Sequence, residues 1–199
     1  MHLTKNVKNI LTITVLAAAL YGASFLIMEK TLVPQNFTDA RITSAKTAGE
    51  LMAILGASQL NLSQISEFHK NSQFFKALEL VRLELENGKQ SLAKSQQLAA
   101  ELNSLANFAN GITPIKARNL AVEAIKLDLA IMGKLIQYNT SFNSLLEILQ
   151  LKFSGAITAD NSAEIQTQLE NMNSLGKEIN DLNELRSQKM AEFDKLTAK

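Results

Sequence analysis

The sequence contains no cysteine and no tryptophan, and it has only two prolines, eight glycines and two tyrosines in 199 residues. Without cysteine the chain has no disulfides, no thiolate metal ligands and no cysteine nucleophile. So few prolines and glycines favour long uninterrupted helices over short strands joined by turns. We therefore expect an all-α protein.

An excess of charge of either sign is also missing, because the formal net charge is only +1. Leaving out residues 1–30 removes three of the 20 basic and one of the 19 acidic residues, so that 17 and 18 remain. This balance, without a basic stripe, argues against nucleic acid as a partner.

One long apolar run is present. Residues 9–28 read NILTITVLAAALYGASFLIM and include no charged residue. At about 1.5 Å per residue, twenty helical residues span about 30 Å, the thickness of the hydrocarbon core of a bilayer. The run predicts a transmembrane anchor that contacts the lipid bilayer. A cleaved signal peptide is the alternative, with cleavage after Ala19, but it would leave the apolar FLIM of residues 25–28 on the mature chain.

The flanks of this run predict its orientation. Lys5 and Lys8 precede it, and a positively charged flank remains in the cytoplasm. We expect a single-pass membrane protein with a short cytoplasmic N-terminus (1–8), a linker (29–35) and a helical bundle (36–199) on the extracytoplasmic side.

Breaks in the sequence divide the bundle. Pro34 disfavours helix before it, and Gly111 can take the left-handed conformation that ends a helix. Thr113 can cap the next helix with Pro114 in its first turn, and the polar segment 154–162 forms another break, after which Asn161 can cap a helix. Residues 36–109 hold no proline and could form one helix.

A fourth break is expected at the polar cluster HKNS, residues 69–72, with Asn71 or Ser72 as the cap. It divides the chain into four segments of similar length, and such matched segments with short loops are typical of an antiparallel up-down-up-down four-helix bundle. The expected helices cover residues 36–70, 72–109, 114–153 and 161–197.

Leucines and small residues recur every seven positions, which predicts coiled-coil-like packing. One expected seam of the second helix is Leu78, Leu85 and Leu92, and another is Val81, Gly88, Ser95 and Leu102. In the fourth helix the expected seams are Ile165, Met172, Ile179 and Phe193, and Leu175, Leu182 and Leu196.

Three charged residues fall on or beside these seams: Asp128, Arg186 and Lys189. In an antiparallel bundle, Asp128 and Arg186 would differ in height by only about 5 Å. The arithmetic predicts a seam ion pair that fixes helix register or binds a charged ligand. The alternative is that one of these charges turns to solvent.

Four phenylalanines should gather at the end of the bundle farthest from the membrane: Phe68, Phe74, Phe75 and Phe153. Exposed, they would form an interaction tip, and buried, they would close the end of the core. His69 is the one histidine after the apolar run, and we interpret it as a solvated turn residue. With a single histidine and no cysteine we expect no catalytic set, metal or other cofactor.

These features favour a membrane-anchored, non-catalytic structural or interaction module at the cell envelope, with a protein partner or with further copies of itself. The alternative is a ligand-sensing domain, since the layout resembles the periplasmic four-helix bundles of bacterial chemoreceptors and sensor kinases in architecture. Those receptors have a second membrane helix and an output domain. None follows Leu196 in this sequence, so signalling would require a partner. An enzyme is the third and least favoured hypothesis.

Overall fold

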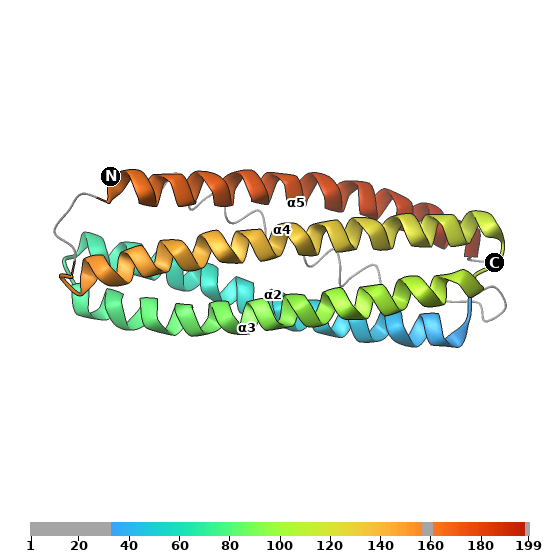
Figure 1. Ribbon diagram of the computed structural model, residues 1–199, viewed down its shortest axis with the longest axis horizontal. Coiled ribbons are helices and arrows are strands. Elements are labelled where there is room, and N and C mark those ends of the chain that lie inside the picture. The colour runs from blue at the N-terminus through green and yellow to red at the C-terminus, as the bar shows by residue number, and fades with distance from the viewer. Residues whose placement is uncertain (1–32, 157–160, 198–199) are drawn as a thin grey trace.

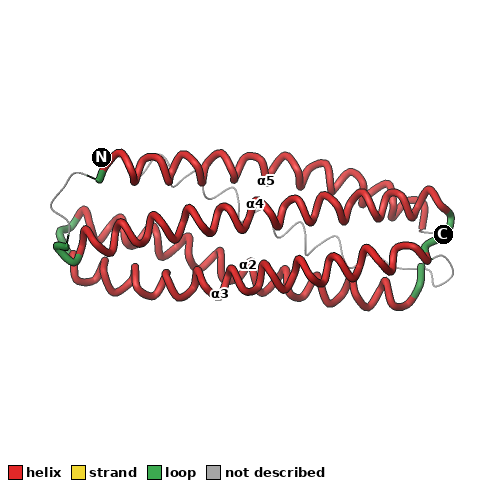
Figure 2. The backbone as a smooth tube through the Cα atoms, viewed as in Figure 1, coloured by secondary structure: helices red, strands yellow, loops and turns green. Residues whose placement is uncertain are grey.

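The computed structural model describes residues 33–156 and 161–197, which form a rod of four long helices (Figures 1 and 2). A short 3-10 turn, η1, continues α3, and no strand occurs in the described ranges. The all-helical fold of four packed helices is therefore confirmed. The helices are α2 (Gln35–Lys70), α3 (Phe74–Phe108), α4 (Ile115–Phe153) and α5 (Ser162–Thr197), with η1 at Ala109–Gly111.

Consecutive helices run in opposite directions, so the loops lie at the two ends of the rod (Figure 2). We call the end where α2 begins the proximal end, and the end with the α2–α3 turn the distal end. The anchor expected at residues 9–28 and its flank 1–8 lie outside the described residues. No helix within the described ranges is long and apolar enough to cross a bilayer.

The α2–α3 turn lies within residues 71–73, so the alternative of a single helix over 36–109 is wrong. Ser72 adopts a positive φ of 56°, which reverses the chain, and the Gln73 amide donates to the Phe68 carbonyl at 2.8 Å. Gln73 then precedes α3 without a side-chain capping bond. The expected cap at Asn71 or Ser72 is therefore also wrong, because both residues are used in the reversal.

The α3–α4 connection differs from the expected one in two details. Gly111 ends η1 without a positive φ, and a Cβ at this position would lie 2.7 Å from the Pro34 Cγ atom. Glycine is therefore needed here because the backbone at Gly111 lies close to the Pro34 ring at the start of α2. Pro114, in extended conformation, is the residue that precedes α4, in place of Thr113.

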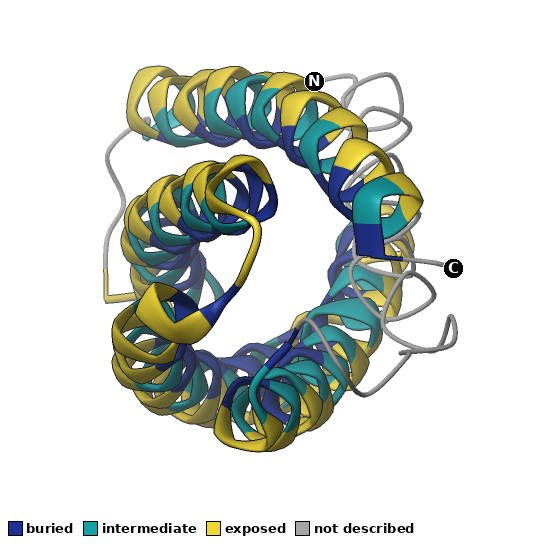
Figure 3. Ribbon diagram, turned by 90° about the vertical axis from the view of Figure 1, so that its right-hand side faces the viewer, coloured by how far each residue is buried: buried dark blue, intermediate teal, exposed yellow. Residues whose placement is uncertain are grey.

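Buried residues line the inner side of every helix, as the end-on view shows (Figure 3). The buried apolar residues form two clusters. The proximal cluster includes Phe37, Ile112 and Phe193, and the distal cluster includes Phe142 and Ile165. The rings of Phe37 and Phe193, with centroids 6.3 Å apart, join α2 to α5 at the proximal end.

The seams of α3 and α5 are only partly those expected. The row Val81, Gly88, Ser95 and Leu102 is buried, but Leu78, Leu85 and Leu92 are only half-buried. In α3 the second buried row lies one position before the leucines that were expected to form it. In α5 a buried row with Gly176 and Asn183, one position after Leu175 and Leu182, takes the place of the expected one. Small and polar residues thus take the place of leucines on the buried faces of these two helices. The second buried row of α3 is Ala77, Glu84, Ser91, Leu98 and Leu105.

Gly88 shows how close this approach is. A Cβ built on Gly88 would collide with Oδ1 of Asn143 on α4, whereas one on Gly133, an exposed glycine of α4, meets nothing within 4 Å. Glycine at position 88 therefore leaves room for the Asn143 side chain between α3 and α4.

We expect Gly88→Ala to destabilise the bundle relative to Gly133→Ala by about 1–3 kcal/mol, because Asn143 must leave its position. Gly133→Ala is the matched control and should raise stability by about 0.5–1 kcal/mol through helix propensity. Urea unfolding of the full-length protein, followed by circular dichroism, measures both. Equal stabilisation by the two substitutions would contradict the close approach.

Candidate functional site

Asp128 of α4 and Arg186 of α5 meet inside the bundle. Arg186 Nε donates to Asp128 Oδ1 at 3.1 Å, and the two side chains are only 8% and 10% exposed. The antiparallel course of α4 and α5 brings these positions to the same height, as the sequence arithmetic required. The structure therefore places two of the three seam charges together, in a buried ion pair.

A second pair adjoins the first. Arg41 Nη1 of α2 lies 3.7 Å from Asp194 Oδ1 of α5, and both side chains are largely buried. Arg41 is close enough to Asp128 and Arg186 to interact with them electrostatically. The two pairs thus form one ionic cluster that connects α2, α4 and α5 near the proximal end.

Burial dominates the electrostatics of this cluster. It raises the pKa of Asp128, and the Arg186 guanidinium opposes that rise. It also lowers the pKa of Arg41, against the attraction of Asp194, and raises the pKa of Asp194, against that of Arg41. Because a buried ion pair is weak evidence for stability, we infer that the cluster mainly fixes the arrangement of the helices.

Lys189, the third seam charge, does not join the cluster. Its Nζ atom pairs with Glu123 Oε2 of α4 at 2.8 Å on the half-exposed rim of the bundle. Lys189 lies three positions after Arg186, so its long side chain can reach water at the edge of the helix face.

A cavity of about 40 Å³ adjoins the ionic cluster. All four helices contribute to its wall, which carries two guanidinium groups, Arg41 and Arg186, and one carboxylate, Asp128. The Nη1 atom of Arg186 is buried and has no hydrogen-bond partner among the described residues. The rest of the wall is mainly apolar, with Ala45, Ala48, Leu98, Leu102, Leu105 and Met132.

The four phenylalanines expected at the distal end divide into three environments. Phe74 and Phe153 pack with His69, whose ring centroid lies 5.9 Å and 5.5 Å from theirs. Phe68 lies apart, under the Lys76 ammonium at 5.7 Å. Phe75 is 73% exposed and Phe74 is 46% exposed. The distal end is therefore neither fully closed nor a continuous patch of four rings.

His69 differs from its expected place as a solvated turn residue, because its ring packs against those of Phe74 and Phe153, which also pack against each other. Partial burial lowers the pKa of its imidazole, and the nearby Lys152 lowers it further. Neutral imidazole is the form that suits an aromatic environment.

A buried polar layer between the two apolar clusters was missed in the sequence. Glu84 of α3 is fully buried, and its Oε1 accepts hydrogen bonds from the amides of Asn61 at 2.6 Å and Asn87 at 2.7 Å. Nearby, Asn139 of α4 donates to the Ser91 hydroxyl at 2.8 Å. The seven-residue spacing of Glu84 from Ala77 and Ser91 was a signal for this layer, although leucine counting favoured the neighbouring row.

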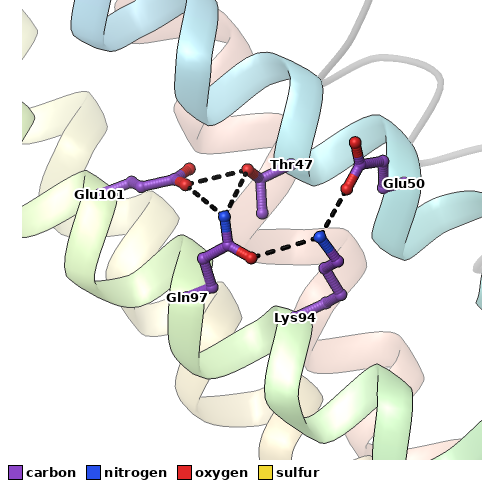
Figure 4. A network of polar contacts seen from close by, with 5 residues as sticks. All are labelled: Thr47, Glu50, Lys94, Gln97 and Glu101. Atoms are coloured by element: carbon purple, nitrogen blue, oxygen red, sulfur yellow. Dashed lines mark hydrogen bonds and ion pairs between the residues drawn. The ribbon is translucent and has the colours of Figure 1, made fainter.

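A half-exposed network joins α2 to α3 on the outside of the rod (Figure 4). Lys94 Nζ donates to Glu50 Oε2 at 2.6 Å and to Gln97 Oε1 at 3.2 Å. Glu101 Oε1 accepts from the Thr47 hydroxyl at 3.0 Å and from the Gln97 amide at 2.8 Å. These contacts fix the register of α2 against α3, and they leave no free constellation for chemistry.

Within the described ranges, no group of three histidine, aspartate or glutamate residues could hold a metal ion. Comparison with known proteins yields no relative, since no family model, curated protein or solved structure matches the chain. The candidate sites are therefore defined by geometry: the ionic cluster with its cavity, and the aromatic distal end.

The double-mutant cycle of Asp128 and Arg186 tests the ionic cluster. Asp128→Leu leaves the Arg186 guanidinium buried without its carboxylate, and we expect a loss of about 3–5 kcal/mol in unfolding free energy. Adding Arg186→Leu should recover most of that loss, because no buried charge then remains in this pair. Urea unfolding of the full-length protein measures the cycle, and strictly additive losses would disprove the pairing.

Proposed function

We propose that the chain is a membrane-anchored, non-catalytic bundle that holds a protein-binding tip away from the outer surface of a membrane. The uncharged residues 9–28 would supply the anchor, and the lysines before them would keep the N-terminus in the cytoplasm. The bundle then lies on the extracytoplasmic side, at the cell envelope.

The geometry of the rod supports this proposal. The described chain enters the bundle at the proximal end, at Val33, and α2 then runs for 36 residues to the distal end. At about 1.5 Å per residue, this helix spans about 50–55 Å. A tether before Val33 therefore places Phe74 and Phe75 at the far end from the bilayer.

The observation that carries the proposal is the exposure of Phe75 and Phe74 at that end. Exposing a phenylalanine ring to water costs free energy, and aromatic residues are enriched in protein–protein interfaces. Polar residues flank the pair, with Asn71 and Gln73 before it and Lys76 after it, all of them exposed. An apolar group inside a polar rim is the usual anatomy of a protein interface. We commit to a partner protein of the envelope as the ligand.

Site-specific crosslinking in cells tests the tip. A photoreactive phenylalanine analogue at position 75 should capture one partner reproducibly, and adding Phe74→Ser should greatly reduce the yield. The loss expected for one anchoring ring is about 2 kcal/mol, or roughly thirtyfold in affinity. Mass spectrometry of the crosslinked product identifies the partner.

Ile115 provides the matched control, because it is an apolar residue that is 64% exposed at the proximal end. The same analogue at position 115 should not capture the partner. Equal capture at both positions, or no capture at position 75, would overturn the tip proposal. Capture of a second copy of the chain at position 75 would replace the partner protein with self-assembly.

The anchor has its own test. Placing arginine in the middle of the apolar run, as Ala18→Arg, should cost about 2.5–3.5 kcal/mol of membrane insertion. We expect the protein to move from the membrane fraction to the soluble fraction of cell lysates. Ala191→Arg, at an exposed position of α5, is the control and should leave fractionation unchanged. Similar behaviour of the two variants would contradict the anchor, and the intact mass of the wild type reports cleavage.

Ligand sensing is the second candidate function, and one observation favours it. The cavity beside the ionic cluster is lined by the charged side chains of Arg41, Asp128 and Arg186 together with apolar residues. A small ligand at this position would contact all four helices.

A further inference from the structure

A pocket that is open to solvent on one side adjoins the aromatic rings of the distal end. Helices α2, α4 and α5 form its wall. Two of the lining rings, Phe153 and His69, pack against Phe74, with centroids 6.2 Å and 5.9 Å from the Phe74 ring. The pocket is therefore continuous with the tip formed by Phe74 and Phe75. Its apolar wall consists of Leu62, Ile65, Leu145, Leu149, Phe153 and Ile165.

The size of the pocket limits what can enter it. Its volume is about 20 Å³, and a single buried water requires about 10–15 Å³. The pocket thus has room for one or two water-sized groups, which corresponds to the end of one aliphatic side chain. An aromatic ring or a metabolite would be too large. Because the wall is mainly apolar, an alkyl group suits it better than a water molecule does.

Lys152 supplies the charge at this pocket. It lines the wall from the last turn of α4, is half-buried, and makes no ion pair with any described residue. The imidazole of His69 is uncharged near neutral pH, because burial and then Lys152 lower its pKa. No acidic side chain of the described ranges lines the pocket, and the neighbouring acids Glu67 and Glu164 are exposed. The wall therefore carries one positive charge without a counter-charge.

We propose that the pocket receives the aliphatic side chain of a leucine or methionine of the partner protein, and that Lys152 binds a carboxylate beside it. The bound segment of the partner is thus both apolar and acidic, and it covers Phe74 at the same time. The carboxylate offsets the desolvation that an approaching apolar surface imposes on the Lys152 ammonium group. This inference rests on the proposed function, because it names the chemistry of the protein that the distal tip binds.

Photocrosslinking from the pocket wall tests the inference in cells that make the full-length protein. The photoreactive phenylalanine analogue, placed at position 153, should capture the same partner as it does at position 75. Mass spectrometry of the crosslinked peptide should locate the adduct beside a leucine or methionine, with an aspartate or glutamate close to it in the partner.

Charge reversal gives the decisive variant. Lys152→Glu should reduce capture at position 75 roughly tenfold, because it places a like charge beside the carboxylate of the partner. Lys126→Glu, at an exposed position of the same helix, is the matched control and should keep capture, as should Lys152→Arg. Lys152→Gln, a milder change at the end of α4, should reduce capture roughly threefold. Changing the mapped acidic residue of the partner to lysine should restore capture by Lys152→Glu.

Three results would overturn the inference: no capture at position 153, unchanged capture at position 75 in Lys152→Glu, or a crosslinked peptide without an acidic residue. Each of them leaves the proposed tip standing as long as position 75 captures the partner in the chain with Lys152 intact. Absence of capture at position 75 in that chain would instead refute the tip, and the inference that rests on it would fall as well.

Discussion

The buried ion pair between Asp128 and Arg186 is the constraint on which the arrangement of α4 and α5 depends. Slipping one helix by a heptad would move its partner by about 10 Å and leave two charges in an apolar interior without compensation. Two pairs on the rim, Glu123 with Lys189 and Lys134 with Glu178, fit the same register. Apolar heptads alone tolerate such slips, because one leucine layer resembles the next. The charges therefore favour one register of α4 against α5, although burial raises the pKa of Asp128 and so works against its charged form.

The same reasoning applies to the layer around Glu84, which separates the proximal apolar cluster from the distal one. Its carboxylate accepts two asparagine amides, from α2 and from α3, and Asn139 reaches across from α4 to Ser91. A buried polar atom without a partner costs about 1–3 kcal/mol, so losing any of these bonds would be expensive, and Oε2 of Glu84 already has no partner among the described residues. A rod with identical leucine layers along its length could shear, whereas this rod has two polar positions that match in only one alignment. Polar groups thus define the structure, and the apolar clusters supply most of the driving force.

Helix number, the turn near residue 71 and the meeting of Asp128 with Arg186 could be predicted from the sequence, because each depends on distances along the chain. Arg41 and Asp194 obey the same height arithmetic and were overlooked. The seams of α3 and α5 could not be predicted by counting leucines. Glu84, Gly176 and Asn183 face the interior while Leu85, Leu175 and Leu182 are only half-buried. For Glu84 the reason is its hydrogen bonds from Asn61 and Asn87, which counting leucines does not reveal. The exposure of Phe75 could not be predicted either, since the sequence left open whether the phenylalanines at this end are exposed or close the core.

The ionic cluster and the aromatic distal end lie at different heights along the rod. The polar layer around Glu84 lies between them and limits how a ligand at one site could affect the other. Coupling between sites requires an element with two arrangements that each ligand stabilises differently. Between the cavity and the distal end lies the Glu84 layer, whose hydrogen bonds hold α2 to α3, together with the Asn139–Ser91 bond that holds α3 to α4. A sliding motion of these helices would have to break them. A ligand in the cavity would therefore stabilise the proximal end without moving the phenylalanines at the other. On this argument the ionic cluster and the Glu84 layer hold the proximal and distal parts of the bundle in one alignment, so that neither site depends on movement of the other.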